Sequence, residues 1–249
     1  KRFGDIAYLQ STLHDYRFSP ALASYHGNFV ANYALDKANA DHLSVLKAKL
    51  DTDQFSIEIP LFDKPDSTWL IADLNNRLSV PTYYLFNKKN QHLKPVLTDI
   101  QQRADKNVSL LSANDIAPKF AFSYLARDGF QLQGYLTLPR GIDIKTAPLV
   151  VDVHGGPWSR TEGGYSKAIQ FLANRGYIVF QPNFRASTGL GKAYKFGTKQ
   201  DFGDGITQND IVDGTLFLLN NGVGDSNRVA ITGHSFGGFS VLAGLSFTP

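Results

Sequence analysis

The 249-residue sequence predicts an α/β fold with a mainly parallel sheet, preceded by antiparallel β segments. The first observation behind this is a change of pattern along the chain. Short β-like segments fill residues 1–104, whereas apolar runs alternate with helix-like segments from about residue 119 onward. The second is the pentapeptide Gly-His-Ser-Phe-Gly at 233–237, placed between an apolar run and a helix-like run. We therefore expect two domains, 1–104 and 105–249.

The N-terminal part reads as short strands spaced by polar turns, which is typical of an antiparallel meander. Residues 41–50 are more helix-like. A four-stranded unit of this kind fits one blade of a β-propeller, and about 100 residues would supply roughly two blades. A small β-domain or an extended β-linker fits the same pattern. The expected strands are FSIEIPLF (55–62), TWLIADLN (68–75), TYYLFNKK (82–89) and LKPVLTDI (93–100).

The C-terminal part reads as strand and helix in alternation. A hairpin signal, Asp128-Gly129, comes first. Each strand that follows is a continuous apolar run, as expected for a strand buried on both faces, and this order predicts parallel strands joined by right-handed crossovers. The expected strands are 147–153, 177–183 and 228–233, and the expected helices are 166–176, 210–222 and 236–245.

Composition excludes several classes of partner. The chain is 43% hydrophobic and has a net charge of +3 spread along its length, which is too mild and diffuse to indicate nucleic-acid binding. No apolar run is long enough to span a bilayer. The chain has no cysteine and no cluster with metal-ligand spacing, so we expect neither a metal ion nor a cofactor. Compartment and oligomeric state stay open.

Ser235 is the strongest candidate for chemistry. In a G-x-S-x-G turn between a strand and a helix, the serine of an α/β-hydrolase is lifted above the sheet as a nucleophile. Gly233 and Gly237 have no Cβ, which lets strand and helix approach closely. The alternative interpretation is a glycine-rich turn with an incidental serine. The preceding strand and following helix favour the nucleophile.

His154-Gly155-Gly156-Pro157 is the second element, directly after the strand at 147–153. An acyl-transfer nucleophile needs N–H donors for the developing oxyanion. One would be the backbone N–H of Phe236, and the other a glycine N–H of this loop, as in esterases with an HGGG-type segment. We expect Gly156 to be that donor, with Gly155 the next choice.

A general base is harder to find. All six histidines precede Ser235, His234 adjoins it and points elsewhere, and His154 more naturally braces its own loop. Residues 236–249 contain no Asp, Glu or His, although an α/β-hydrolase places its acid and base after the serine. With no methionine in the chain, this favours an internal fragment of a longer protein.

Several segments together resemble the prolyl oligopeptidase family of serine peptidases, in particular its acylaminoacyl-peptidase-like members. The resemblance covers about 130 residues well and extends loosely over 41–104, whereas the first 40 residues are placed only by position. The segments are ARDGFQLQGYLTLP (126–139), VDVHGGPWSR (151–160), FLANRGY (171–177), NFRASTGLGKAY (183–194) and RVAITGHSFGGFSVLAGLSFTP (228–249).

The resemblance implies the end of a β-propeller followed by the first part of an α/β-hydrolase domain that cleaves short peptides. Ser235 would be the nucleophile, Phe236 and Gly156 the oxyanion donors, and Arg185 a brace for the active-site loops. Trp158 and Tyr165 are candidates for lining the substrate pocket.

The family's acid and base would lie beyond Pro249, so the chain is expected to be inactive alone. Two other functions remain open: a carboxylesterase or lipase, and a non-catalytic binding module that uses the propeller.

Overall fold

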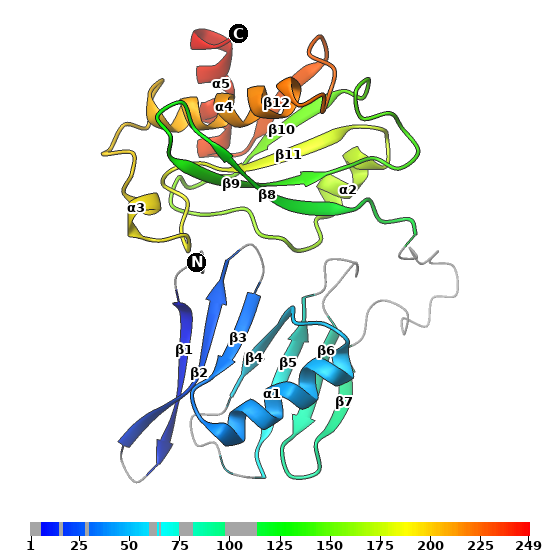
Figure 1. The fold of residues 1–249 in the computed structure, drawn as a ribbon, viewed down its shortest axis with the longest axis vertical. Coiled ribbons are helices and arrows are strands. Elements are labelled where there is room, and N and C mark those ends of the chain that lie inside the picture. Colours follow the sequence, from blue (N-terminus) through cyan, green and yellow to red (C-terminus); the bar gives the residue numbers. More distant parts are fainter. Residues whose placement is uncertain are drawn as a thin grey trace. The chain divides into compact units, whose positions relative to one another are not determined.

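The computed structural model describes residues 6–14, 17–27, 30–59, 64, 66–74, 82–97 and 114–249. The chain divides into two compact units, Lys1–Leu111 and Ser112–Pro249, each with its own sheets (Figure 1). No helix of the described residues is long and apolar enough to cross a membrane.

The first unit contains two antiparallel sheets and one helix. Its first sheet contains β1 (Ile6–His14), β2 (Arg17–His26) and β3 (Val30–Ala34), in that order. We had no separate expectation for these three strands. Its second sheet is a four-stranded meander in chain order. That sheet consists of β4 (Phe55–Glu58), β5 (Thr68–Asp73), β6 (Thr82–Asn87) and β7 (His92–Leu97).

These four strands match the four expected β segments. The ends of three of them, 60–62, 75 and 98–100, lie outside the described residues. Helix α1 (Lys37–Leu50) begins four residues before the expected helix-like stretch, because the Asp36 side chain caps it by accepting a hydrogen bond from the Asn39 N–H at 2.8 Å. The helix packs over the sheets through Leu43 and Leu46, and the core around them also contains Leu22, Phe55, Ile57, Trp69, Ile71 and Phe86.

The second unit is built on one five-stranded sheet in the order β12-β10-β11-β9-β8. The sheet is mixed rather than mainly parallel. The three strands expected to be parallel are so: β10 (Leu149–Val153) pairs in parallel with both β11 (Ile178–Asn183) and β12 (Val229–Gly233). The hairpin of β8 (Lys119–Leu125) and β9 (Gln131–Thr137), turning at Asp128-Gly129, then extends the same sheet antiparallel to β11.

Helices lie on both faces of this sheet. The chain steps from β10 to β11 through α2 (Lys167–Ala173), then back across β10 to β12 through α4 (Ile206–Asn220). Right-handed crossovers in opposite directions put the two helices on opposite faces. Short α3 (Lys192–Lys195) precedes α4, and α5 (Phe236–Phe247) follows β12 (Figure 1).

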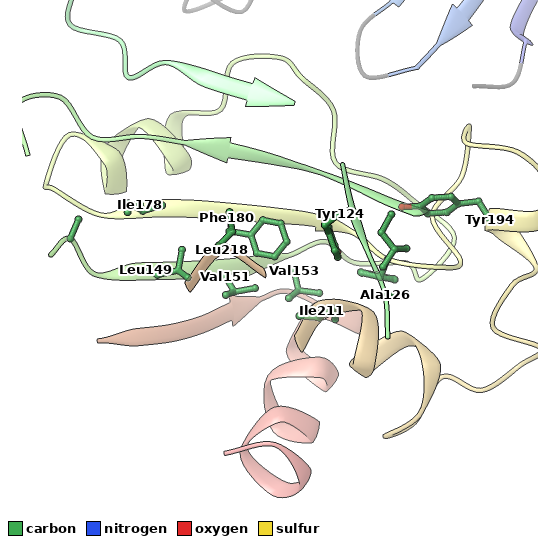
Figure 2. Packing of buried hydrophobic residues seen from close by; sticks show 13 residues of the cluster. Tyr124, Ala126, Leu149, Val151, Val153, Ile178, Phe180, Tyr194, Ile211 and Leu218 are labelled. Carbon is green, nitrogen blue, oxygen red and sulfur yellow. The ribbon is translucent and has the colours of Figure 1, made fainter. Parts of the chain in front are cut away.

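The core of the second unit lies between the sheet and α4. Alternate side chains of β10, with Ile178 and Phe180 of β11, face Ile211 and Leu218 of the helix (Figure 2). The first unit's core shares no residue with this cluster. The carboxyl ends of β10 and β12, which carry the two glycine-rich motifs, meet at one edge of the sheet because these strands are parallel neighbours.

Candidate active site

Ser235 lies on a strained turn between β12 and α5. Its backbone has φ 57° and ψ −119°, a conformation that costs a non-glycine residue on the order of 1–3 kcal/mol. The Gly237 N–H donates to the His234 carbonyl at 2.9 Å and closes the turn. The serine side chain is exposed and has no hydrogen-bond partner among the described residues. The turn therefore presents a free hydroxyl directly before the amino end of a helix.

Two glycines allow this turn. A Cβ on Gly237 would lie 2.1 Å from the carbonyl oxygen of Val153, and a Cβ on Gly233 would lie 2.6 Å from the carbonyl carbon of Gly237. No real Cβ tolerates such distances, so both positions require glycine for close packing of the helix against β10 and β12. The flanking glycines of the motif thus have the role that the sequence predicts for them.

The loop after β10 meets the serine at Gly155. A Cβ on Gly155 would lie 3.4 Å from Cβ and 3.9 Å from Oγ of Ser235. Gly156 follows with φ 130°, and a Cβ there would lie 2.7 Å from the Trp158 nitrogen. In the described part of the chain, neither the Gly156 N–H nor the Phe236 N–H donates a hydrogen bond. Both amides are without a hydrogen-bond acceptor among the described residues, and Phe236 and Gly156 as the oxyanion donors stay a prediction.

His154 braces the loop rather than the serine. Its Nδ1 donates to the Gly155 carbonyl at 2.7 Å, so Nε2, 2.9 Å from the Ser187 hydroxyl, is the acceptor. The ring also stacks on Phe184, with the ring centres 4.3 Å apart. The pKa of His154 is lowered to about 4, mainly by burial and in part by the charge of Arg160, while the hydrogen bond to Gly155 opposes the shift. At neutral pH the ring is uncharged and both nitrogens are engaged.

An aromatic row borders the serine. The Phe236 ring contacts Phe184, Phe202 and Phe239, and Phe202 meets Trp158 edge to face at 5.6 Å between ring centres. Trp158 is 58% exposed. The row thus leads from the residue after the nucleophile to an open indole. Tyr165, the other pocket candidate, is half-buried just before α2 and makes no ring contact or hydrogen bond with any described residue.

Arg185 is buried at the end of β11 and contacts the protein's own carboxylates. Its guanidinium donates to Asp210 of α4 at 2.6 Å and to Asp128 in the hairpin turn, and it lies over the Phe130 ring. Its backbone N–H also donates to Asp210 at 2.8 Å. Burial opposes the charge on Arg185, but the hydrogen bonds to Asp210 and Asp128 outweigh it and raise its pKa. The guanidinium locks three elements behind the site together.

Other residues that support the site gave no motif in the sequence. Asn183 of β11 holds Thr161 of the loop in both directions, accepting from its N–H at 2.8 Å and donating to its carbonyl at 3.1 Å. Lys119 of β8 binds the same loop further along. The polar Asn183 at the end of the apolar run 177–183 was a usable signal. Lys119 and Phe202 come from distant segments, and only the folded sheet brings them to the site.

The described residues contain no group of three or more His, Cys, Asp or Glu side chains that could hold a metal ion. The arrangement instead fits nucleophilic chemistry: an exposed hydroxyl, two unengaged amides and a helix amino end, whose partial positive charge favours a developing oxyanion.

The part of the chain that contains Ser235 is similar to known proteins. A model of the prolyl oligopeptidase family matches residues 164–249. Dipeptidyl aminopeptidase BIII of Pseudoxanthomonas mexicana is 35% identical over 192 residues, which cover 74% of this chain and 26% of that protein. The chain spans about a quarter of the length of the curated relatives it matches.

Solved structures share the fold across nearly the whole chain. A puromycin-hydrolysing peptidase of Mycobacterium tuberculosis superposes with a TM-score of 0.70 at 19% identity, covering 96% of this chain and 35% of that one. An acylaminoacyl peptidase of Pyrococcus horikoshii gives 0.66 at 19% identity, covering 99% and 36%. At this identity the likeness establishes the fold alone.

Proposed function

Because the chain belongs to the prolyl oligopeptidase family, we propose that it forms part of a serine peptidase that hydrolyses short peptides through an acyl-enzyme on Ser235. Substrates would be of the oligopeptidase or acylaminoacyl-peptidase type, the latter being the named activity of a protein with the same fold. The observation that carries the proposal is the strained turn of Ser235 with Gly155 packed against its side chain.

The proposed reaction begins with attack of the Ser235 hydroxyl oxygen on the scissile carbonyl carbon, while a general base takes the hydroxyl proton. The carbonyl oxygen becomes an oxyanion, which the N–H groups of Phe236 and Gly156 stabilise. Collapse of this intermediate expels the amine, which takes the proton from the base, and leaves an ester on Ser235. Water then hydrolyses the ester by the same steps.

The general base would come from outside the second unit. That unit contains two histidines: His154 is engaged at both nitrogens, and burial lowers its pKa to about 4, which makes it a poor base at neutral pH. His234 directly precedes the nucleophile in the chain. We infer that the base and its carboxylate partner lie elsewhere in the complete gene product, and that these 249 residues are inactive alone.

The first unit is proposed to be the last part of a β-propeller, about two blades within residues 1–104. The four-stranded meander of β4 to β7 supports this, because a blade is such a sheet. In this proposal the propeller limits access to short peptides, and Trp158 and Tyr165 line the near side of the pocket. The catalytic part would span 105–249.

Active-site labelling of the complete gene product tests the function. We expect a fluorophosphonate probe to label the protein, and Ser235→Ala to abolish labelling and lower peptide hydrolysis by several orders of magnitude. Ser246→Ala is the matched control, because Ser246 is an exposed serine of the same α5 helix. Labelling with fast ester and negligible peptide turnover would indicate a carboxylesterase or lipase. No labelling at all would indicate a non-catalytic binding module.

A further inference from the structure

The loop between β10 and α2, residues 154–166, needs a fixed orientation because it carries Gly155 and Gly156. Its first half is attached to the neighbouring strand and the loop after it. Thr161 is held in both directions by the Asn183 side chain, and the Thr188 N–H donates to the Ser159 carbonyl at 2.8 Å. These contacts lie between the glycines and the second half of the loop.

Lys119 attaches the second half. It lies on β8, opposite Thr137 of β9, and its ammonium donates to the Glu162 carbonyl at 2.7 Å and to the Gly164 carbonyl at 3.4 Å. The same ammonium lies 4.7 Å from the centre of the Tyr135 ring. Strand β8 is the edge of the sheet furthest from β12, so this contact links the far edge to the loop beside the nucleophile.

The contacts of Asn183 and Lys119 together restrict this loop more than either contact alone. A segment held only at Thr161 can swing about that point, whereas a second attachment one to three residues later also fixes its direction. Hydrogen bonds from an ammonium to carbonyl oxygens are stronger than those between neutral groups. The bonds from Lys119 are therefore suited to holding a loop whose own backbone forms neither helix nor strand.

We propose that Lys119 is a positioning residue for the peptidase reaction: it holds Glu162 and Gly164 so that Gly155 and Gly156 keep their places beside Ser235. The inference rests on the proposed function, because it assigns Lys119 to the same oxyanion loop. In this role Lys119 acts through its contacts with the loop, not on the reacting atoms.

The charge of this ammonium changes within an accessible pH range. Burial lowers the pKa of Lys119 to about 8, while Asp152 of β10 and Glu162 of the loop oppose the shift. Tyr135 of β9 also lies against the ammonium, and Arg160 of the loop interacts in turn with Tyr135. The lysine loses its charge as pH rises through about 8, and a neutral amine holds the two carbonyls less strongly. We therefore expect turnover to fall in part on this alkaline side.

Kinetics of the complete gene product on a chromogenic peptide test the role. Lys119→Met should lower kcat by roughly tenfold, below the 100- to 1000-fold cost of losing an oxyanion donor, and leave KM within about twofold. Lys119→Arg should restore most of kcat and remove the fall in kcat near pH 8, because the guanidinium stays charged. Lys167→Met is the matched control, since Lys167 is an exposed lysine at the start of α2.

The proposal is overturned if kcat of Lys119→Met equals that of Lys167→Met. It is also overturned if kcat of Lys119→Arg still falls near pH 8 as in the wild type. This measurement remains decisive if the Met variant does not fold. Fluorophosphonate labelling of the wild type separates the two levels of inference. If the wild type is not labelled, the peptidase function itself is contradicted. If the wild type is labelled but the Lys119 substitutions leave kcat unchanged, only the positioning role is contradicted.

Discussion

Gly237 has less room for a side chain than Gly233, the other flanking glycine of the Ser235 turn. A Cβ there would lie 2.1 Å from the Val153 carbonyl oxygen, which is backbone of the neighbouring strand and cannot move aside cheaply. We expect Gly237→Ala to destabilise the protein by about 1–3 kcal/mol, the usual cost of overpacking, and to reduce labelling of Ser235. Urea denaturation measures the first effect and probe labelling the second.

Gly238 offers the matched control one position later in the same helix. The nearest atom to its Cβ position is the Gly233 carbonyl oxygen at 3.6 Å, an ordinary contact. Alanine there should be neutral or stabilise the helix by up to ~1 kcal/mol, because glycine is the poorer helix former. Equal losses of stability in the two variants would contradict the role of Gly237 as the close-packing residue.

At the scale of elements, one buried ion pair joins β11 and the hairpin to α4. Arg185 and Asp210 have side chains that are 6% and 0% exposed, so removing Asp210 leaves the buried guanidinium with Asp128 alone, whose side chain is 48% exposed. We expect Asp210→Ala to lower the free energy of unfolding by about 3–5 kcal/mol, measured by urea denaturation. Asp225→Ala breaks the exposed pair with Arg228 and should cost far less. Similar losses in both variants would show that Asp128 alone compensates the charge of Arg185.

Elements whose signals are local in the sequence could be predicted. The apolar runs at 147–153, 177–183 and 228–233 became the three parallel strands, because a strand buried on both faces has no polar face to interrupt it. The Asp128-Gly129 turn predicted its hairpin, but nothing local indicated that the hairpin would extend the parallel sheet. The pairing of Gln133 in β9 with Asn183 in β11 is a contact across 50 positions of sequence.

The candidate site divides in the same way. Ser235 and its two flanking glycines form a motif within five residues. The sequence therefore predicted the strained turn that the structure shows between β12 and α5. The supports of the loop after β10 come from β8, β11 and the segment around Ser187, which only folding brings together. Long-range support of this kind leaves a trace in the sequence only where a polar residue ends an apolar strand, as Asn183 does.

At the scale of the whole molecule, the chain builds two separate hydrophobic cores. One lies under α1 and contains Trp69 and Ile71, and the other lies under α4 and contains Ile178 and Phe180. Each core is buried by elements of its own unit, so each unit has its own source of hydrophobic stability. A substitution in one core removes contacts from that core alone.

This separation predicts that the local stabilities of the two units are independent of each other. Amide hydrogen exchange measures both units in one sample. Ile71 and Ile178 are both fully buried, and truncating such a side chain to alanine costs about 2–5 kcal/mol. Ile71→Ala should therefore accelerate amide exchange in β5 by roughly thirtyfold or more and leave β11 unchanged, because exchange in core strands follows the local free energy of opening. Ile178→Ala is the reciprocal control and should accelerate exchange in β11 alone. If either substitution accelerated both strands equally, the two cores would have to unfold as one cooperative body.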